Sequence, residues 1–126
     1  MRKVISFLVF GFILVMNVMS VYPQEDQDWE RIYRKEYENL IDRPAWVYKF
    51  NSVANFITQE IESIGTYYFS RMSFDLACIS YKVLLDIGVE RGYIDDKIKQ
   101  QRLDMLKEKR NIVSEYLAKQ SGRLGL

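Results

Sequence analysis

Apolar residues recur every three or four positions along most of the chain after Pro23, which is the spacing of one face of an α-helix. The clearest example follows Pro44, where polar residues separate the members of an apolar row: Trp46, Phe50, Val53, Ile57, Ile61 and Ile64. No segment shows the two-residue alternation that a half-buried β-strand requires. The pattern therefore predicts an all-α fold.

The first helix is predicted to begin near Asp26 or Asp28, because carboxylates suit the free amide groups and the positive dipole end of a first turn. It would place one row of residues on its apolar face: Trp29, Tyr33, Tyr37, Leu40 and Ile41. Pro44 should end this helix, since the residue before a proline is pushed out of helical geometry. Proline also suits the first turn of a helix, so the second helix is predicted to start there.

A break is predicted near Gly65. The next segment, Thr66 to Ile87, carries four charged residues that fall within an arc of about 60° on a helical wheel: Arg71, Asp75, Lys82 and Asp86. If one helix ran through Gly65, this charged arc would lie in line with the apolar row of the preceding helix. A single face would then have to be buried at one end and solvated at the other, so the chain should reverse near Gly65.

Glycine and aspartate mark the next connection. Gly88 is predicted to end the third helix as a left-handed cap, and Gly92 to help the chain turn before Asp95 and Asp96 open a fourth helix. In that helix an apolar row recurs every seven residues with two apolar neighbours beside it, which predicts the contact line of near-parallel helix packing: Ile98, Met105, Ile112, Leu106 and Val113.

The connections between these helices look short, so consecutive helices should be antiparallel. The chain is therefore predicted to form a small antiparallel helical bundle of about four helices. The bundle would occupy residues 21–120, and residues 121–126, which include two glycines, would form a flexible tail.

The N-terminal segment has the layout of a secretory signal, because Arg2 and Lys3 precede an apolar run from Val4 to Val21. Residues 1–20 are interpreted as a signal peptide with cleavage after Ser20. The alternative is an uncleaved signal-anchor helix, which would span about 27 Å of the roughly 30 Å core of a bilayer. In both cases the body is expected outside the cytoplasm, either periplasmic or extracellular or anchored to the membrane by this segment.

The amino-acid composition narrows the kinds of functional site that this chain can form. The chain has no histidine, so the commonest metal ligand and the usual base near neutral pH are missing. Cys78 is the single cysteine, cannot form an intramolecular disulfide, and is interpreted as a small core residue in the middle of a helix. The formal net charge of +1 gives no indication of nucleic acid as a partner.

The acidic residues of this chain form no pattern that is typical of a catalytic pair or a metal site. Glu60 and Glu62 are two residues apart and would point away from each other on a helix, so they cannot share one substrate. The acidic cluster at Glu25, Asp26 and Asp28 lacks the glycine and distal glutamate of a calcium loop. No catalytic, cofactor-binding or metal-binding residue is predicted, and no cofactor is expected.

Arg102 and Lys109 stand out because both fall within the apolar arc of the fourth helix. A hairpin folded at Gly88 to Gly92 would bring Asp75 within a turn or two of both bases. One hypothesis is an ion pair of Asp75 with Arg102 or Lys109. The alternative is that both long side chains extend past the helix contact into water.

Aromatic residues are abundant and could mark a partner surface, since aromatic anchors dominate protein interfaces. Trp29, Tyr33 and Tyr37 have the spacing of a stripe that faces a core. Tyr67, Tyr68 and Tyr81 are harder to place in a core, and some of them are expected to be exposed.

Three functions remain open. The leading one is an exported, non-enzymatic cell-envelope protein that acts by protein–protein interaction, with another envelope protein or by self-association. The second is a single-pass, membrane-tethered accessory subunit that contacts the membrane through residues 1–21. The third is a small enzyme or ligand-binding module, whose sign would be a pocket that gathers Arg71, Asp75 or Arg102 with aromatic walls.

Overall fold

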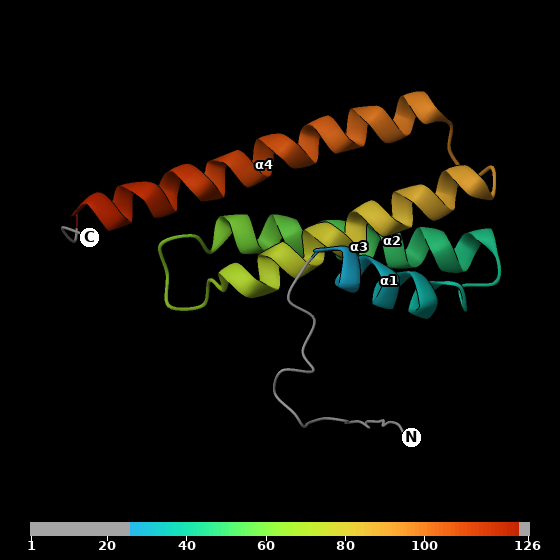
Figure 1. Cartoon of the computed structure of the whole chain (residues 1–126), viewed down its shortest axis with the longest axis horizontal. Helices are drawn as coiled ribbons and strands as arrows, with labels where there is room; N and C mark the ends of the chain where they lie inside the picture. The colour runs from blue at the N-terminus through green and yellow to red at the C-terminus, as the bar shows by residue number, and fades with distance from the viewer. Residues whose placement is uncertain (1–25, 124–126) are drawn as a thin grey trace, which may run out of the picture. The chain divides into compact units, whose positions relative to one another are not determined.

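The computed structural model describes residues 26–123, which form four helices and no strand (Figure 1). The helices are α1 (Asp26–Tyr37), α2 (Arg43–Glu62), α3 (Arg71–Glu90) and α4 (Asp96–Arg123). The predicted all-α fold is confirmed for this range. The predicted signal or anchor helix lies outside the described residues. Of the predicted tail, residues 121–123 continue α4 and residues 124–126 lie outside the described range.

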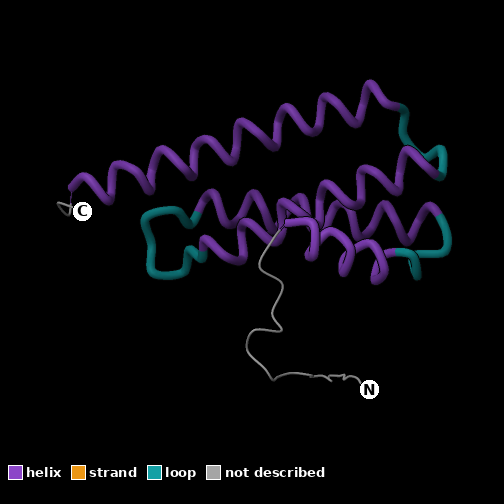
Figure 2. The backbone as a smooth tube through the Cα atoms, viewed as in Figure 1, coloured by secondary structure: helices purple, strands orange, loops and turns teal. Residues whose placement is uncertain are grey.

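The described residues fall into two units that divide between Arg31 and Ile32. Within the described part of the first unit, Arg31 pairs with Asp28 at 2.9 Å across one turn of α1. The second unit holds the hydrophobic core. Its central element is α3, which packs against both α2 and α4. Consecutive helices from α2 to α4 run in opposite directions, as the short connections predict (Figure 2).

Three helix starts are fixed by side-chain caps. The Asp42 carboxylate accepts from the Ala45 backbone N at 2.9 Å, and Pro44 lies in the first turn of α2, as predicted. The Ser70 hydroxyl accepts from the Ser73 backbone N at 3.1 Å, so α3 starts at Arg71 instead of near Thr66. Asp95 caps α4 by accepting from the Ile98 backbone N at 2.8 Å.

The predicted reversal at Gly65 is confirmed. Helix α2 ends at Glu62, and Gly65 has a φ of +86°, which an L-residue with a side chain rarely adopts. The chain then turns back into α3.

Gly88 is not a helix cap, and that prediction is wrong. Gly88 lies buried inside α3, and Gly92, with a φ of +78°, takes the left-handed conformation after the helix. A Cβ atom on Gly88 would lie 2.6 Å from Cζ2 of Trp46, and the Trp46 indole donates to the Leu84 carbonyl at 2.8 Å. Gly88 therefore gives the indole room to lie directly on the backbone of α3.

Two predicted apolar rows are only partly buried. Tyr37 is in the core, and Tyr33 and Leu40 pack against it, but Ile41 is exposed because α1 ends at Tyr37 and the helical phase is lost. In α4, Leu106 and Val113 are buried against the core.

The predicted seven-residue contact line of α4 is wrong as a core feature. Ile98, Met105 and Ile112 are exposed, while Leu106 and Val113, one position further along the helix, are buried. One residue corresponds to a rotation of about 100°, so α4 packs on α3 with a neighbouring face.

Candidate functional site

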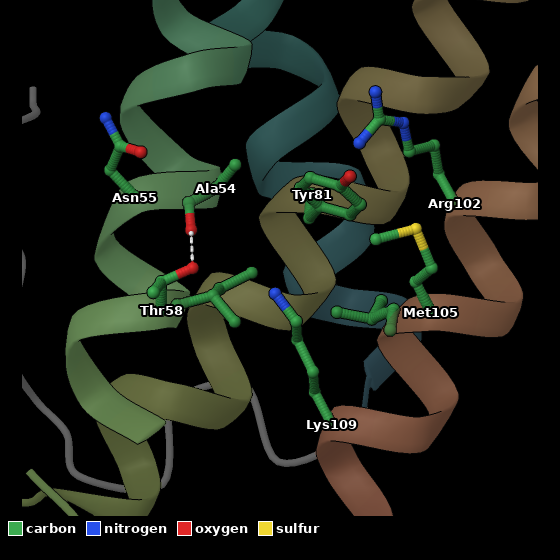
Figure 3. A pocket seen from close by; sticks show the side chains of 9 residues that line it. Ala54, Asn55, Thr58, Tyr81, Arg102, Met105 and Lys109 are labelled. Carbon is green, nitrogen blue, oxygen red and sulfur yellow. Dashed lines mark hydrogen bonds between the residues drawn. The ribbon is translucent and has the colours of Figure 1, made fainter. Parts of the chain in front are cut away.

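A groove of about 190 Å³ lies between α2 and α4 in the second unit, with Tyr81 of α3 at its floor (Figure 3). We call it the basic groove. Arg102 and Lys109 both extend from α4 toward it. Its lining contains two cations and no carboxylate: Ala54, Asn55, Ile57, Thr58, Tyr81, Arg102, Met105, Leu106 and Lys109. The groove therefore presents positive charge above an aromatic floor.

Tyr81 is held in place by packing. Its ring stacks on Phe50 with 4.8 Å between centroids, and the side chain is buried. Burial raises the pKa of the Tyr81 phenol, and the positive charge of Arg102 and a hydrogen bond with it act against that shift. The phenol thus stays protonated near neutral pH. The ring forms a fixed floor of the groove, and its hydroxyl adds a polar group to that floor.

The hypothesis that Asp75 pairs with Arg102 or Lys109 is wrong. The Asp75 carboxylate pairs with Arg71 one turn earlier in α3, at 3.1 Å. A partner four residues away on the same helix is available without any contact between helices. The two bases of α4 lie at the basic groove instead.

The third functional hypothesis expected a pocket gathering Arg71, Asp75 or Arg102. Of these three, Arg102 alone lines the basic groove, together with aromatic Tyr81. The groove is also smaller than the roughly 300–1,000 Å³ of most small-molecule pockets. The hydroxyl of Thr58 donates to the Ala54 carbonyl at 3.2 Å within α2. The lining residues can attract anionic groups, and the lining contains no histidine and no carboxylate.

A second candidate surface is the connection between α2 and α3, residues 63–70, which we call the aromatic loop. Tyr67 is 95% exposed and Tyr68 is 81% exposed, and their rings meet edge to face with 5.7 Å between centroids. The expectation that some surplus aromatics are exposed is confirmed here. Tyr81, in contrast, is buried.

The backbone of the aromatic loop is held by local hydrogen bonds. The Thr66 hydroxyl donates to the Ser63 carbonyl at 2.6 Å and accepts from the Tyr68 backbone N at 3.2 Å. The carboxylate of Glu60 accepts from the Ser70 backbone N at 3.2 Å. Phe69 turns inward and packs against the core. The loop is thus anchored at both ends while its two tyrosines project outward.

Side chains at the end of α1 fasten it to α3. The hydroxyls of Tyr37 and Ser80 share a buried hydrogen bond of 2.6 Å, and Lys49 Nζ lies 5.6 Å from the centroid of the Tyr37 ring. Arg34 forms an ion pair with Glu90, and this contact lowers the pKa of the Glu90 carboxyl. These contacts hold the end of α1 against α3.

Cys78 is buried in α3, as its mid-helix position predicts. Burial raises the pKa of its thiol to about 12, so the reactive thiolate is disfavoured near neutral pH. In residues 26–123, no group of three or more Cys, Asp or Glu side chains is arranged to hold a metal ion.

Across the same described range, no helix combines the length and the apolar character needed to cross a bilayer. A scan against models of protein families finds no match for this chain, and no curated protein or solved structure is significantly similar to it.

Proposed function

We propose that this protein is exported from the cytoplasm and acts in the cell envelope, without catalysis, by binding another envelope protein through the aromatic loop. The observation that carries this proposal is the outward-facing pair Tyr67 and Tyr68 on an anchored backbone. Export is supported by the sequence pattern at the N-terminus, where Arg2 and Lys3 precede the apolar run Val4 to Val21.

Two exposed tyrosines on an anchored loop favour binding of a protein partner at a low cost in ordering. Tyrosine is enriched among the residues that contribute most to protein interfaces, because its large flat ring buries apolar area while its hydroxyl keeps a hydrogen bond. Association also costs the ordering of loops and side chains. Hydrogen bonds at Ser63, Thr66 and Ser70 already hold this loop, so less ordering remains to be done on binding.

Met72 is a further exposed apolar side chain close to the aromatic loop in sequence. It lies in the first turn of α3. Its flexible thioether can adapt to an irregular partner surface. A protein partner of mixed apolar and polar character would suit this combination better than a charged polymer, since no cation lies within residues 63–70.

Site-specific photo-crosslinking in the cells that naturally produce the protein tests the proposal. A photoreactive benzoylphenylalanine replaces Tyr67 in one variant and Tyr48 in a matched control. Tyr48 is also a largely exposed tyrosine, but it lies on α2, away from the loop. We expect a light-dependent adduct with one other protein at position 67, and much less at position 48.

The crosslinked masses separate the alternatives. Tyr68→Ser should reduce the yield of the position 67 adduct several-fold while leaving the helical circular dichroism signal unchanged. An adduct of twice the chain mass would show self-association through the loop in place of a second protein. Equal yields at both positions, or no adduct at either, would exclude the aromatic loop as the binding surface.

A further inference from the structure

Helix α4 carries an apolar line that takes no part in the core. Ile98, Met105 and Ile112 are 39%, 47% and 46% exposed, and they are spaced by seven residues. Seven residues make almost two full turns, so the three side chains lie along one edge of the helix. Single exposed apolar residues are common on protein surfaces. A straight line of three at heptad spacing is the pattern by which one helix packs along another.

The two sides of this line carry opposite charges. Met105 borders the basic groove, with Arg102 and Lys109, and it also borders a second hollow whose other lining residues are Asp104, Lys107, Glu108 and Asn111. On a helical wheel Lys109 lies about 40° to one side of Met105 and Glu108 about 60° to the other. Around Met105, the exposed face of α4 is therefore an apolar line with a basic edge, Arg102 and Lys109, and an acidic edge, Asp104 and Glu108. Two lysines, Lys97 and Lys119, lie on the acidic side nearer the two ends of the helix.

The charges on these two edges favour a second copy of the same helix as the partner, in the parallel orientation. If α4 lies beside α4 of a second copy in parallel, related by a two-fold axis along the helices, the basic edge of each copy meets the acidic edge of the other. Glu108 then faces Lys109 of the second copy, and Asp104 faces Arg102 of the second copy. In an antiparallel pair, basic edges would meet basic edges and acidic edges would meet acidic ones.

The packing of α4 leaves room for this pairing. Leu106 and Val113, which face the core, lie about 100° and 80° around the helix from Met105. The core-facing side of each copy would therefore point sideways relative to its partner. We propose that α4 forms a parallel, two-fold homodimer through Ile98, Met105 and Ile112, with its charged edges setting the orientation.

This contact is distinct from the aromatic loop of the proposed function, so either can fail alone. Self-association at α4 is a property of the purified chain and needs no second protein. Binding of another envelope protein at Tyr67 is measured in cells and does not require α4.

Cysteine crosslinking of the purified protein tests the orientation. In a parallel pair, position 105 of one copy faces position 105 of the other, so Met105→Cys should give a disulfide-linked dimer under mild oxidation. Lys107→Cys is the matched control, because it is exposed on the same helix but turned well away from the apolar line. Native Cys78 is buried with a thiol pKa of about 12, so the unmodified chain should stay uncrosslinked.

Charge reversal supplies an independent test by sedimentation equilibrium. Arg102→Glu with Lys109→Glu makes both edges acidic, and Asp104→Lys with Glu108→Lys makes both edges basic. Each double variant should self-associate about tenfold more weakly, which is the combined effect of several surface ion pairs. A one-to-one mixture should form heterodimers, because acidic edges then meet basic edges on both sides.

Circular dichroism checks that each variant keeps its helices. A wild-type chain that stays monomeric at every concentration tested would overturn the proposal. Equal crosslinking of Met105→Cys and Lys107→Cys would also overturn it. A mixture of the two charge variants that associates no better than either alone would exclude the proposed role of the edges.

Discussion

Because Gly88 has no Cβ atom, α2 and α3 can approach each other closely at this position. The Trp46 indole lies against the backbone at this position, and a Cβ atom there would come within 2.6 Å of the ring. Gly88→Ala should therefore destabilise the protein by about 1–3 kcal/mol, because the indole must shift and lose packing and its hydrogen bond to Leu84. Urea denaturation followed by circular dichroism measures this change.

Gly122 provides the control for that substitution. It lies in α4, and a Cβ atom added there would meet no other atom within 4 Å, so Gly122→Ala adds the same methyl group to an open helical site. This change should stabilise the protein slightly, by at most about 1 kcal/mol, because alanine favours helix more than glycine does. A loss of stability of similar size at both positions would contradict the close contact inferred at Gly88.

At the scale of elements, the end of α1 is tied to α3 by one buried hydrogen bond between Tyr37 and Ser80. Removing one partner leaves the other hydroxyl buried without its partner, so Tyr37→Phe and Ser80→Ala should each cost about 1–3 kcal/mol of folding free energy. The double variant should cost less than the sum of the two, because it leaves neither hydroxyl unpaired.

Urea unfolding of the four proteins completes this thermodynamic cycle. A coupling energy near zero would mean that the two hydroxyls do not depend on each other in the folded protein. A substitution at Tyr33 is a poor control, because its ring stacks on Tyr37 with 5.7 Å between centroids. Thr58→Val is better suited, since its hydroxyl bonds within α2 and is exposed.

At the scale of the whole molecule, export is a separate question from folding. Expressed with its leader in a bacterial host, the chain should be recovered outside the cytoplasm, shorter by residues 1–20 and starting at Val21. Intact-mass spectrometry measures this directly. Full-length chain in the membrane fraction would favour the tethered accessory subunit, and full-length chain in the cytoplasm would contradict export.

Local sequence rules predicted the elements well. Pro44, and Asp95 with Asp96, mark helix starts because proline geometry and capping depend on neighbouring residues alone. The reversal at Gly65 followed from comparing two helical faces in one continuous phase. The apolar row from Trp46 to Ile57 identified the buried side of α2, since helical periodicity is also a local property.

Where two nearby residues of similar character could fill the same structural role, the tertiary structure decided which of them does. Gly88 and Gly92 both resemble caps in sequence, and the approach of Trp46 decides that Gly88 stays helical. Met105 and Leu106 are both apolar, and the position of α3 decides which of them is buried.

For the charged residues too, the sequence decided one part and the tertiary structure another. Arg102 and Lys109 were recognisable as unusual from their place on the helical wheel, but their position at a groove beside Tyr81 depends on how α2 and α4 are spaced across α3. The amino-acid sequence by itself determined that the chain is helical and where most helices begin, because those signals act over a few residues. Which faces meet, and which apolar line is left exposed, was decided by packing between segments far apart in the chain.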